Sequence, residues 1–326
     1  MSRLIAVRHI DVFNGDADGI CALHQLRMAE PVEAELITGV KHDIELIKRV
    51  NAGSGDQVTV LDVSLDRNRG ALVNLLERGA RVRYFDHHAA PDIPVHPGLE
   101  AMIDESADIC TSILVDRFLG GRFRIWAVVA AFGDNLGSAA LGLAQSIKLD
   151  KDQQAALQEL GENLNYNAYG ETESDLLIPP ADLYRMVKRY TDPFHLIRKE
   201  PVIGRLGKER VSDLKQALEV APQRVSGKSD AYVFPDEPWS RRVSGTFANH
   251  LTTVGPNRAH AVLTRNARGG YTISVRSPLE GKSSALGFCR LFATGGGRLH
   301  AAGINHLEPA RLEEFLDRFE ESFRAR

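Results

Sequence analysis

The sequence has little cysteine and no long apolar run. Its three cysteines, Cys21, Cys110 and Cys289, lie far apart in a chain of 326 residues and form no Cys-x-x-Cys pair. The pattern indicates neither a disulfide framework nor a thiolate zinc site, and we expect three buried thiols. No apolar stretch approaches the roughly 20 residues that span a bilayer, and residues 1–7 lack the pattern of a secretory signal. We therefore expect a cytoplasmic protein with no membrane partner.

The chain also lacks a strong excess of charge of either sign. Its net charge of −3 gives no global attraction to nucleic acid. The charge is unevenly spread, however, because residues 241–298 hold nine basic side chains and one acidic side chain. This segment predicts a local cationic surface that could bind an anion, and a solvated face is the alternative.

The content of the chain is typical of a protein that folds throughout, with 43% hydrophobic and 25% charged residues. Its length predicts two domains. In the first half, short β-branched runs alternate with helical patterns, which is the signature of βαβ units and a parallel sheet. The expected strands are residues 8–13, 58–63, 81–85 and 101–103. The expected helices are residues 18–28, 43–51, 65–78 and 106–118.

The rest of the chain predicts a helical completion of the first domain and then a smaller α+β domain. The pattern is helical from residue 137 to about 200, with polar residues 163–169 as an interruption. We expect later strands at 231–234, 259–264 and 271–276, and helices at 242–253, 283–291 and 309–323. The fold class is therefore α/β, with a catalytic domain at 1–197, a linker helix at 198–230 and a substrate-binding domain at 231–326.

Acidic residues and histidines recur where strands are expected to end. Four segments share this position: residues 14–19 (NGDADG), 61–64 (LDVS), 85–88 (FDHH) and 132–135 (FGDN). Ligands of parallel sheets bind beyond the carboxyl ends of the strands, so these side chains should meet in one crevice. Carboxylates combined with imidazoles suit Mn²⁺. A single Asp after a strand is well explained as a helix N-cap, but four such segments indicate a divalent-metal centre.

The set of motifs resembles the DHH phosphoesterase family. This family includes RecJ-like exonucleases, nanoRNases that degrade short oligonucleotides, and cyclic-dinucleotide phosphodiesterases. Residues 16–19 are similar to the first family motif, Asp62 to the second, residues 86–88 to the third and Asp134 to the fourth. The likeness extends over nearly the whole chain.

The resemblance implies a centre of two Mn²⁺ ions, with Mg²⁺ as the other candidate metal. The ligands that it implies are Asp16, Asp18, Asp62, His87 and Asp134. It implies further that Asp62 bridges the two ions and that Asp16 belongs to the second site. His88 would lie beside the phosphate, and Asp86 would orient its neighbours.

The sequence departs from the nanoRNase pattern at Val12, where those enzymes carry a metal-binding histidine. The second ion is therefore expected to bind more weakly. Asn14 is a candidate to replace this histidine in part, through its side-chain carbonyl or a water molecule. Equally, Asn14 could serve only to shape the turn.

A glycine-rich segment near the C-terminus, residues 294–303 (TGGGRLHAAG), combines a freely rotating backbone with side chains that can meet a phosphate. It resembles the Gly-Gly-Gly-His signature of the DHH-associated C-terminal domain, with Arg298 in place of the expected histidine. Residues 274–277 (SVRS) are similar to a strand of that domain. The substrate-binding residues predicted here are Arg276, Gly295, Gly296, Gly297, Arg298 and His300.

The expected function is hydrolysis of phosphate esters of short oligonucleotides or small nucleotides, by a two-metal mechanism in which the ions activate water. In this mechanism Asp62, Asp86 and His88 are the expected catalytic residues. Three alternatives remain open: a catalytically silent nucleotide-binding regulatory protein, a single-strand exonuclease and a manganese pyrophosphatase. The family resemblance also suggests a homodimer.

Overall fold

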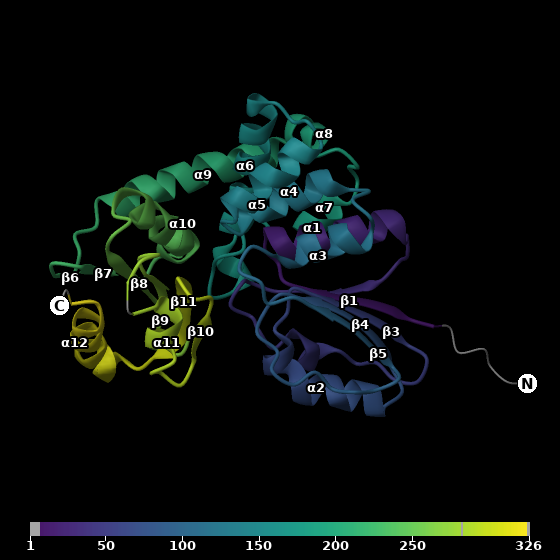
Figure 1. Cartoon of the computed structure of the whole chain (residues 1–326), viewed down its shortest axis with the longest axis horizontal. Coiled ribbons are helices and arrows are strands. Elements are labelled where there is room, and N and C mark those ends of the chain that lie inside the picture. The colour runs from purple at the N-terminus through teal and green to yellow at the C-terminus, as the bar shows by residue number, and fades with distance from the viewer. Residues whose placement is uncertain (1–6, 282, 325–326) are drawn as a thin grey trace, which may run out of the picture. The chain divides into compact units, whose positions relative to one another are not determined.

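The computed structural model describes residues 7–281 and 283–324, which form two compact units (Figure 1). One unit runs to Ala168 and includes Thr172–Gly207, and the other contains Tyr169–Glu171 and begins again at Lys208. The boundary falls inside helix α9 (Pro201–Leu218). Lys282, counted above among the basic residues, lies outside the described residues.

The first unit is built on a five-stranded parallel sheet with the strand order β2-β1-β3-β4-β5. The strands are β1 (His9–Phe13), β2 (Glu35–Ile37), β3 (Gln57–Leu61), β4 (Arg81–Asp86) and β5 (Leu99–Ile103). This confirms the parallel sheet predicted from the sequence. Strand β2 lies on one side of β1 and β3 on the other, so the connections diverge at β1, where ligands of such sheets bind.

Apolar side chains on both faces of this sheet form two separate cores. Along β1, Ile10 and Val12 belong to one core and Phe13 to the other, because successive side chains of a strand point to opposite faces. Helix α2 (Leu65–Glu77) covers the first face, and α1 (Ala17–Ala29), α3 (Thr111–Phe118) and α4 (Arg124–Gly133) lie on the other (Figure 1). The further helices of this unit are α5 (Gly137–Ser146), α6 (Lys151–Tyr166), α7 (Pro180–Val187) and α8 (Pro193–Lys199).

Several sequence predictions for this unit are wrong in detail. The helix expected at residues 43–51 is only the 3-10 turn η1 (Leu46–Arg49). The side chain of Asn68 holds this segment, because it accepts a hydrogen bond from Ile47 N and donates one to the carbonyl oxygen of Ile44. Strand β2 was not predicted at all. Helix α3 begins five residues later than expected, and α6 continues through residues 163–166, where Asn163 and Tyr166 are buried instead of forming a loop.

The second unit is a mixed six-stranded sheet with the strand order β10-β11-β9-β8-β7-β6. The strands are β6 (Arg224–Val225), β7 (Ser229–Val233), β8 (Ala259–Arg265), β9 (Tyr271–Arg276), β10 (Gly295–Gly297) and β11 (Ala301–Leu307). The helices are α10 (Pro238–Val254), α11 (Ala285–Cys289) and α12 (Leu312–Phe323). This confirms the smaller α+β unit expected after the parallel sheet. Among the described residues, none of the helices combines the length and the apolar character that crossing a membrane requires.

The three consecutive glycines form edge strand β10 and not the open loop that the sequence suggested. They pair antiparallel with β11. A Cβ on Gly295 would lie 1.7 Å from the carbonyl oxygen of Cys289, and Gly297 has a φ of 131°, which side chains rarely adopt. Glycine is therefore required here by close packing and backbone conformation.

Candidate metal centre and anion-binding residues

The candidate site lies at the carboxyl ends of three neighbouring strands. Phe13, Leu61 and Phe85 are register partners across β1, β3 and β4, so the residues that follow them emerge at the same level of the sheet. These following residues include Asp16 and Asp18 after β1, Asp62 after β3, and Asp86, His87 and His88 at the end of β4. Asp134 comes instead from the C-terminal end of α4, so the expectation that it follows a strand is wrong.

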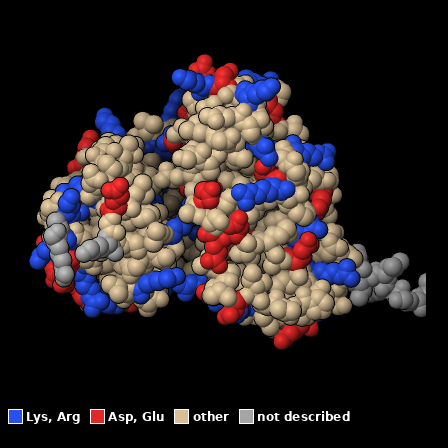
Figure 2. Space-filling model, in the orientation of Figure 1, with Lys and Arg blue, Asp and Glu red and all other residues tan. Residues whose placement is uncertain are grey.

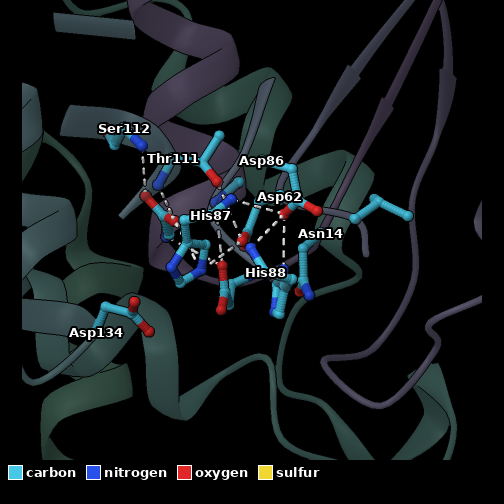
Figure 3. Close-up of polar contacts among 12 residues, drawn as sticks. Asn14, Asp62, Asp86, His87, His88, Thr111, Ser112 and Asp134 are labelled. Atoms are coloured by element: carbon cyan, nitrogen blue, oxygen red, sulfur yellow. Dashed lines mark hydrogen bonds and ion pairs between the residues drawn. The ribbon is translucent and has the colours of Figure 1, made fainter. Parts of the chain in front are cut away.

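Two overlapping sets of side chains are arranged to hold a metal ion. One set is Asp18, His87 and Asp134, and the other is Asp62, His87 and His88. Figure 3 labels Asp62, His87, His88 and Asp134. Within each set the potential ligand atoms lie within 4.8 Å of one another. The Nε2 atom of His87 lies 3.2 Å from Asp62 Oδ1 and 3.9 Å from Asp18 Oδ2. His87 is therefore common to both sets.

The ring of His87 is oriented by the backbone. Its Nδ1 lies 3.1 Å from the carbonyl oxygen of Ile109. A carbonyl oxygen only accepts hydrogen bonds, so Nδ1 carries the proton and Nε2 presents a lone pair to the carboxylates. An imidazole bound through one nitrogen and fixed by a carbonyl at the other is the usual arrangement of a metal-ligating histidine.

Asp18 is held by the first turn of α3. Its two oxygens accept hydrogen bonds from the backbone N–H groups of Thr111 and Ser112, at 2.8 and 2.7 Å. Burial, with the neighbouring carboxylates of Asp62 and Asp134, raises the pKa of Asp18 to about 8. Sequence reasoning missed Thr111 and Ser112 because it began this helix too early.

Asp62 combines a strained backbone with a crowded carboxylate. Its φ is 57°, a left-handed conformation that non-glycine residues adopt at a cost of about 1 kcal/mol or more. The hydroxyl of Thr111 lies 3.4 Å from Asp62 Oδ1. Burial and the charge of Asp16 raise the pKa of Asp62 well above its usual range. A divalent cation between these carboxylates would relieve the repulsion.

Asp86 is enclosed by hydrogen-bond donors and not exposed to a ligand. Its Oδ2 accepts from Leu65 N at 3.1 Å, and its Oδ1 accepts from His87 N at 2.9 Å and from His88 Nδ1 at 2.7 Å. Burial raises the pKa of Asp86, but the nearby His88 outweighs this and the net shift is downward. Asp86 therefore fixes the His88 ring so that Nε2 faces away from it.

Asp16 caps a helix and pairs with a lysine ammonium. Its Oδ1 accepts the N–H groups of Asp18 and Gly19, each at 3.0 Å, which is the bonding of a helix N-cap. Its other oxygen pairs with the ammonium of Lys41, a residue that sequence reasoning missed. The side chain of Asn14 accepts from Asp16 N at 3.3 Å, the contact expected of a residue that shapes the turn.

In the second unit, Arg276 is the centre of a cationic group. Its Nε donates to Asn249 Oδ1 at 3.0 Å, and it also donates to the side chain of Tyr169. Burial lowers the pKa of Arg276, and the nearby guanidinium of Arg298 lowers it further. Each of these two arginines can donate charge-assisted hydrogen bonds to an anion. His300 follows Arg298 by two residues, and its Nδ1 lies 3.2 Å from the hydroxyl of Ser277, the residue after Arg276.

The local cationic surface predicted for residues 241–298 is reduced, because acids from earlier in the chain pair with three of its arginines. Arg242 pairs with Asp213 at 2.9 Å, Arg241 with Asp236 at 2.6 Å, and Arg258 with Asp230. Figure 2 shows basic and acidic side chains interspersed on the visible face. These three arginines are therefore partly neutralised by carboxylates of the protein.

Comparison with known proteins supports the fold and not a particular activity. At the level of sequence, no family model and no curated protein matches this chain. Among solved structures, exonuclease RecJ bound to manganese is 18% identical, with 98% of this chain and 91% of RecJ covered and a TM-score of 0.63. RecJ from Thermus thermophilus in complex with Mn²⁺ is also 18% identical and has a TM-score of 0.61, with 96% of this chain and 51% of that one covered. This chain thus spans about half of the Thermus protein.

A pGpG-specific phosphodiesterase, PggH from Vibrio cholerae, is 12% identical, with 95% of this chain and 96% of PggH covered and a TM-score of 0.52. These similarities show that the chain has the two-domain α/β fold of RecJ-like DHH phosphoesterases. None of them supports a homodimer. RecJ is known with both Mn²⁺ and Mg²⁺, and so the fold is one that accommodates divalent metals.

Proposed function

We propose that this protein is a metal-dependent phosphoric ester hydrolase that acts on short oligonucleotides or small nucleotides. The observation that carries the proposal is that His87 lies between two candidate ligand sets, one with Asp18 and Asp134 and the other with Asp62 and His88. A mixture of carboxylates and one oriented imidazole fits Mn²⁺, with Mg²⁺ as the alternative. The similarity to RecJ and to a pGpG phosphodiesterase supports the same reaction class.

The residues around this point have distinct roles in the proposal. Asp18, Asp62, His87 and Asp134 would hold the metal. A divalent ion bound there supplies charge that stabilises the developing negative charge on phosphorus oxygens and makes water nucleophilic near neutral pH. Asp86 keeps the Nδ1 proton of His88 in place, which leaves Nε2 of His88 to exchange a proton with the substrate or with water.

The second unit would bind the part of the substrate that does not react. Arg276 and Arg298 offer charge-assisted hydrogen bonds to a second phosphate, and Tyr169 offers a ring and a hydroxyl. In this proposal the glycines of β10 permit close approach of the backbone to the substrate, and His300 adds a further polar contact.

The experiment is Mn²⁺-dependent hydrolysis of a panel: dinucleotides, RNA of a few residues, long single-stranded DNA, cyclic dinucleotides, a nucleoside bisphosphate and pyrophosphate. Asp62→Ala is the inactive control, and Asp66→Ala, at the exposed start of α2, is the matched control that keeps activity. The proposal is supported if the wild type and Asp66→Ala hydrolyse the short substrates and Asp62→Ala does not.

A single-strand exonuclease is the second candidate, because the TM-scores with RecJ exceed 0.6. Preference for long single-stranded DNA in the same panel would select it. Release of phosphate from pyrophosphate alone would indicate a pyrophosphatase. Nucleotide binding without any release would favour the regulatory protein and overturn the proposed hydrolase.

A further inference from the structure

The ammonium group of Lys41 lies among side-chain oxygens from three different elements. It forms an ion pair with Asp16 Oδ2 at the start of α1, and it lies 3.1 Å from Asn165 Oδ1 in α6. It also lies 3.9 Å from Asp134 Oδ1 after α4. Two carboxylates and one amide carbonyl around a single point form the kind of oxygen set that a hard divalent ion takes.

The backbone contacts of Lys41 and its neighbours hold it in this position. Its N–H donates to the carbonyl oxygen of Ala168 at 2.8 Å. The preceding Gly39 places its carbonyl oxygen against the turn before α1, where a Cβ on Gly15 would lie only 2.3 Å away. The segment that carries Lys41 is therefore packed against the same turn that carries Asp16.

Both oxygens of the Asp16 carboxylate already have a partner from the protein. One oxygen caps α1 through two backbone N–H groups, and the other faces Lys41. Asp16 accordingly belongs to neither of the ligand sets around His87. Its side chain is 3% exposed and that of Lys41 is 23% exposed, so water screens this ion pair weakly.

We propose that the ammonium of Lys41 holds the place of a second divalent ion, so that the centre binds one ion through the ligands around His87. This inference rests on the proposed function. It replaces the two-ion centre expected from the sequence by one ion and one fixed positive charge.

The test is the number of Mn²⁺ ions bound per chain, measured by isothermal titration calorimetry and native mass spectrometry on the full-length protein. The variants are Lys41→Met, which keeps the length of the side chain without its charge, and Lys41→Arg, which keeps the charge. Lys48→Met is the matched control, because Lys48 lies in the same segment but is exposed and pairs with Glu45. Circular dichroism confirms that each variant is folded.

We expect one Mn²⁺ in the wild type, in Lys41→Arg and in Lys48→Met, and two in Lys41→Met. The second ion should also broaden the Mn²⁺ electron paramagnetic resonance spectrum, since close ions couple. Two ions in the wild type would overturn the inference and leave the proposed function standing. One ion in both the wild type and Lys41→Met would also overturn it, because the ammonium would then not be what excludes the second ion. If the wild type binds no Mn²⁺, the proposed function itself fails.

Discussion

Replacing Asp86 by Asn tests whether this residue organises the centre without binding metal. Asn has nearly the same shape, so the substitution leaves no cavity. An Asn that keeps its carbonyl oxygen toward His87 and His88 must turn its NH₂ group toward the N–H of Leu65, where Asp86 Oδ2 now accepts at 3.1 Å. Two donors then face each other in a site that is fully buried.

The magnitude follows from these contacts. An unsatisfied buried donor pair costs about 1–3 kcal/mol. The 2.7 Å bond from His88 Nδ1 also loses its ionised acceptor, which costs about 1 kcal/mol more. The free energy of unfolding of Asp86→Asn should therefore fall by about 2–4 kcal/mol. Hydrolysis should fall as well, because His88 loses the partner that orients it.

The assay is urea unfolding followed by circular dichroism, in EDTA so that metal binding does not contribute. Asp92→Asn is the control, because the Asp92 side chain is 82% exposed and its loss should change the free energy by less than about 0.5 kcal/mol. If Asp86→Asn unfolds at the same urea concentration as Asp92→Asn, the reasoning about Asp86 is refuted.

Three further predictions concern other parts of the chain. Burial lowers the pKa of His24 from 6.5 to about 4. As the pH drops from 6.5 to 4, the unfolded state takes up a proton before the folded state does, so the free energy of unfolding falls. Urea titrations should show that His24→Gln loses less stability than the wild type over this range, by up to about 3 kcal/mol. Gly161→Ala should destabilise the first unit by about 1–3 kcal/mol, because the added Cβ would lie 2.2 Å from a carbonyl oxygen of α4. In the same urea assay Gly142→Ala should be neutral or stabilising, because a Cβ there would have nothing within 4 Å. Arg276→Met should weaken binding of a nucleoside monophosphate by about 10-fold or more in calorimetry, and Arg268→Met should not.

Each of these predictions has a result that contradicts it. Equal acid sensitivity of the wild type and His24→Gln would show that this buried imidazole does not control acid stability. A stable Gly161→Ala would mean that α4 and α6 separate at little cost. Unchanged nucleotide affinity in Arg276→Met would remove the second unit from substrate binding.

The parallel sheet and most of the candidate ligands could be predicted because they follow local patterns. Strands β1, β3 and β4 are short runs with β-branched residues, and an acidic residue or histidine follows each within three positions. The common register of Phe13, Leu61 and Phe85 brings those residues to one level. Sheet pairing thus brings the residues after these three strands close together in space.

The remaining parts of the site depend on contacts between distant segments, which no local pattern encodes. Lys41 lies in an irregular segment after the unpredicted strand β2, and its partner Asn165 is 124 positions away. The acids that neutralise Arg242 and Arg258 lie earlier in the chain than the basic segment, so a count within that segment could not include them. The glycines of β10 suggest a freely rotating backbone from sequence alone, because the sequence does not show that Gly295 packs against Cys289.

The most direct test of the central claim is the position of bound manganese in crystals of the protein, located by anomalous diffraction at the manganese absorption edge. The account predicts a peak within coordination distance of His87 Nε2 and of the carboxylates of Asp18, Asp62 and Asp134. It also predicts that this peak is lost in Asp62→Ala. A peak elsewhere, or no peak at a saturating Mn²⁺ concentration, would contradict the assignment of these residues as the metal centre of a phosphohydrolase.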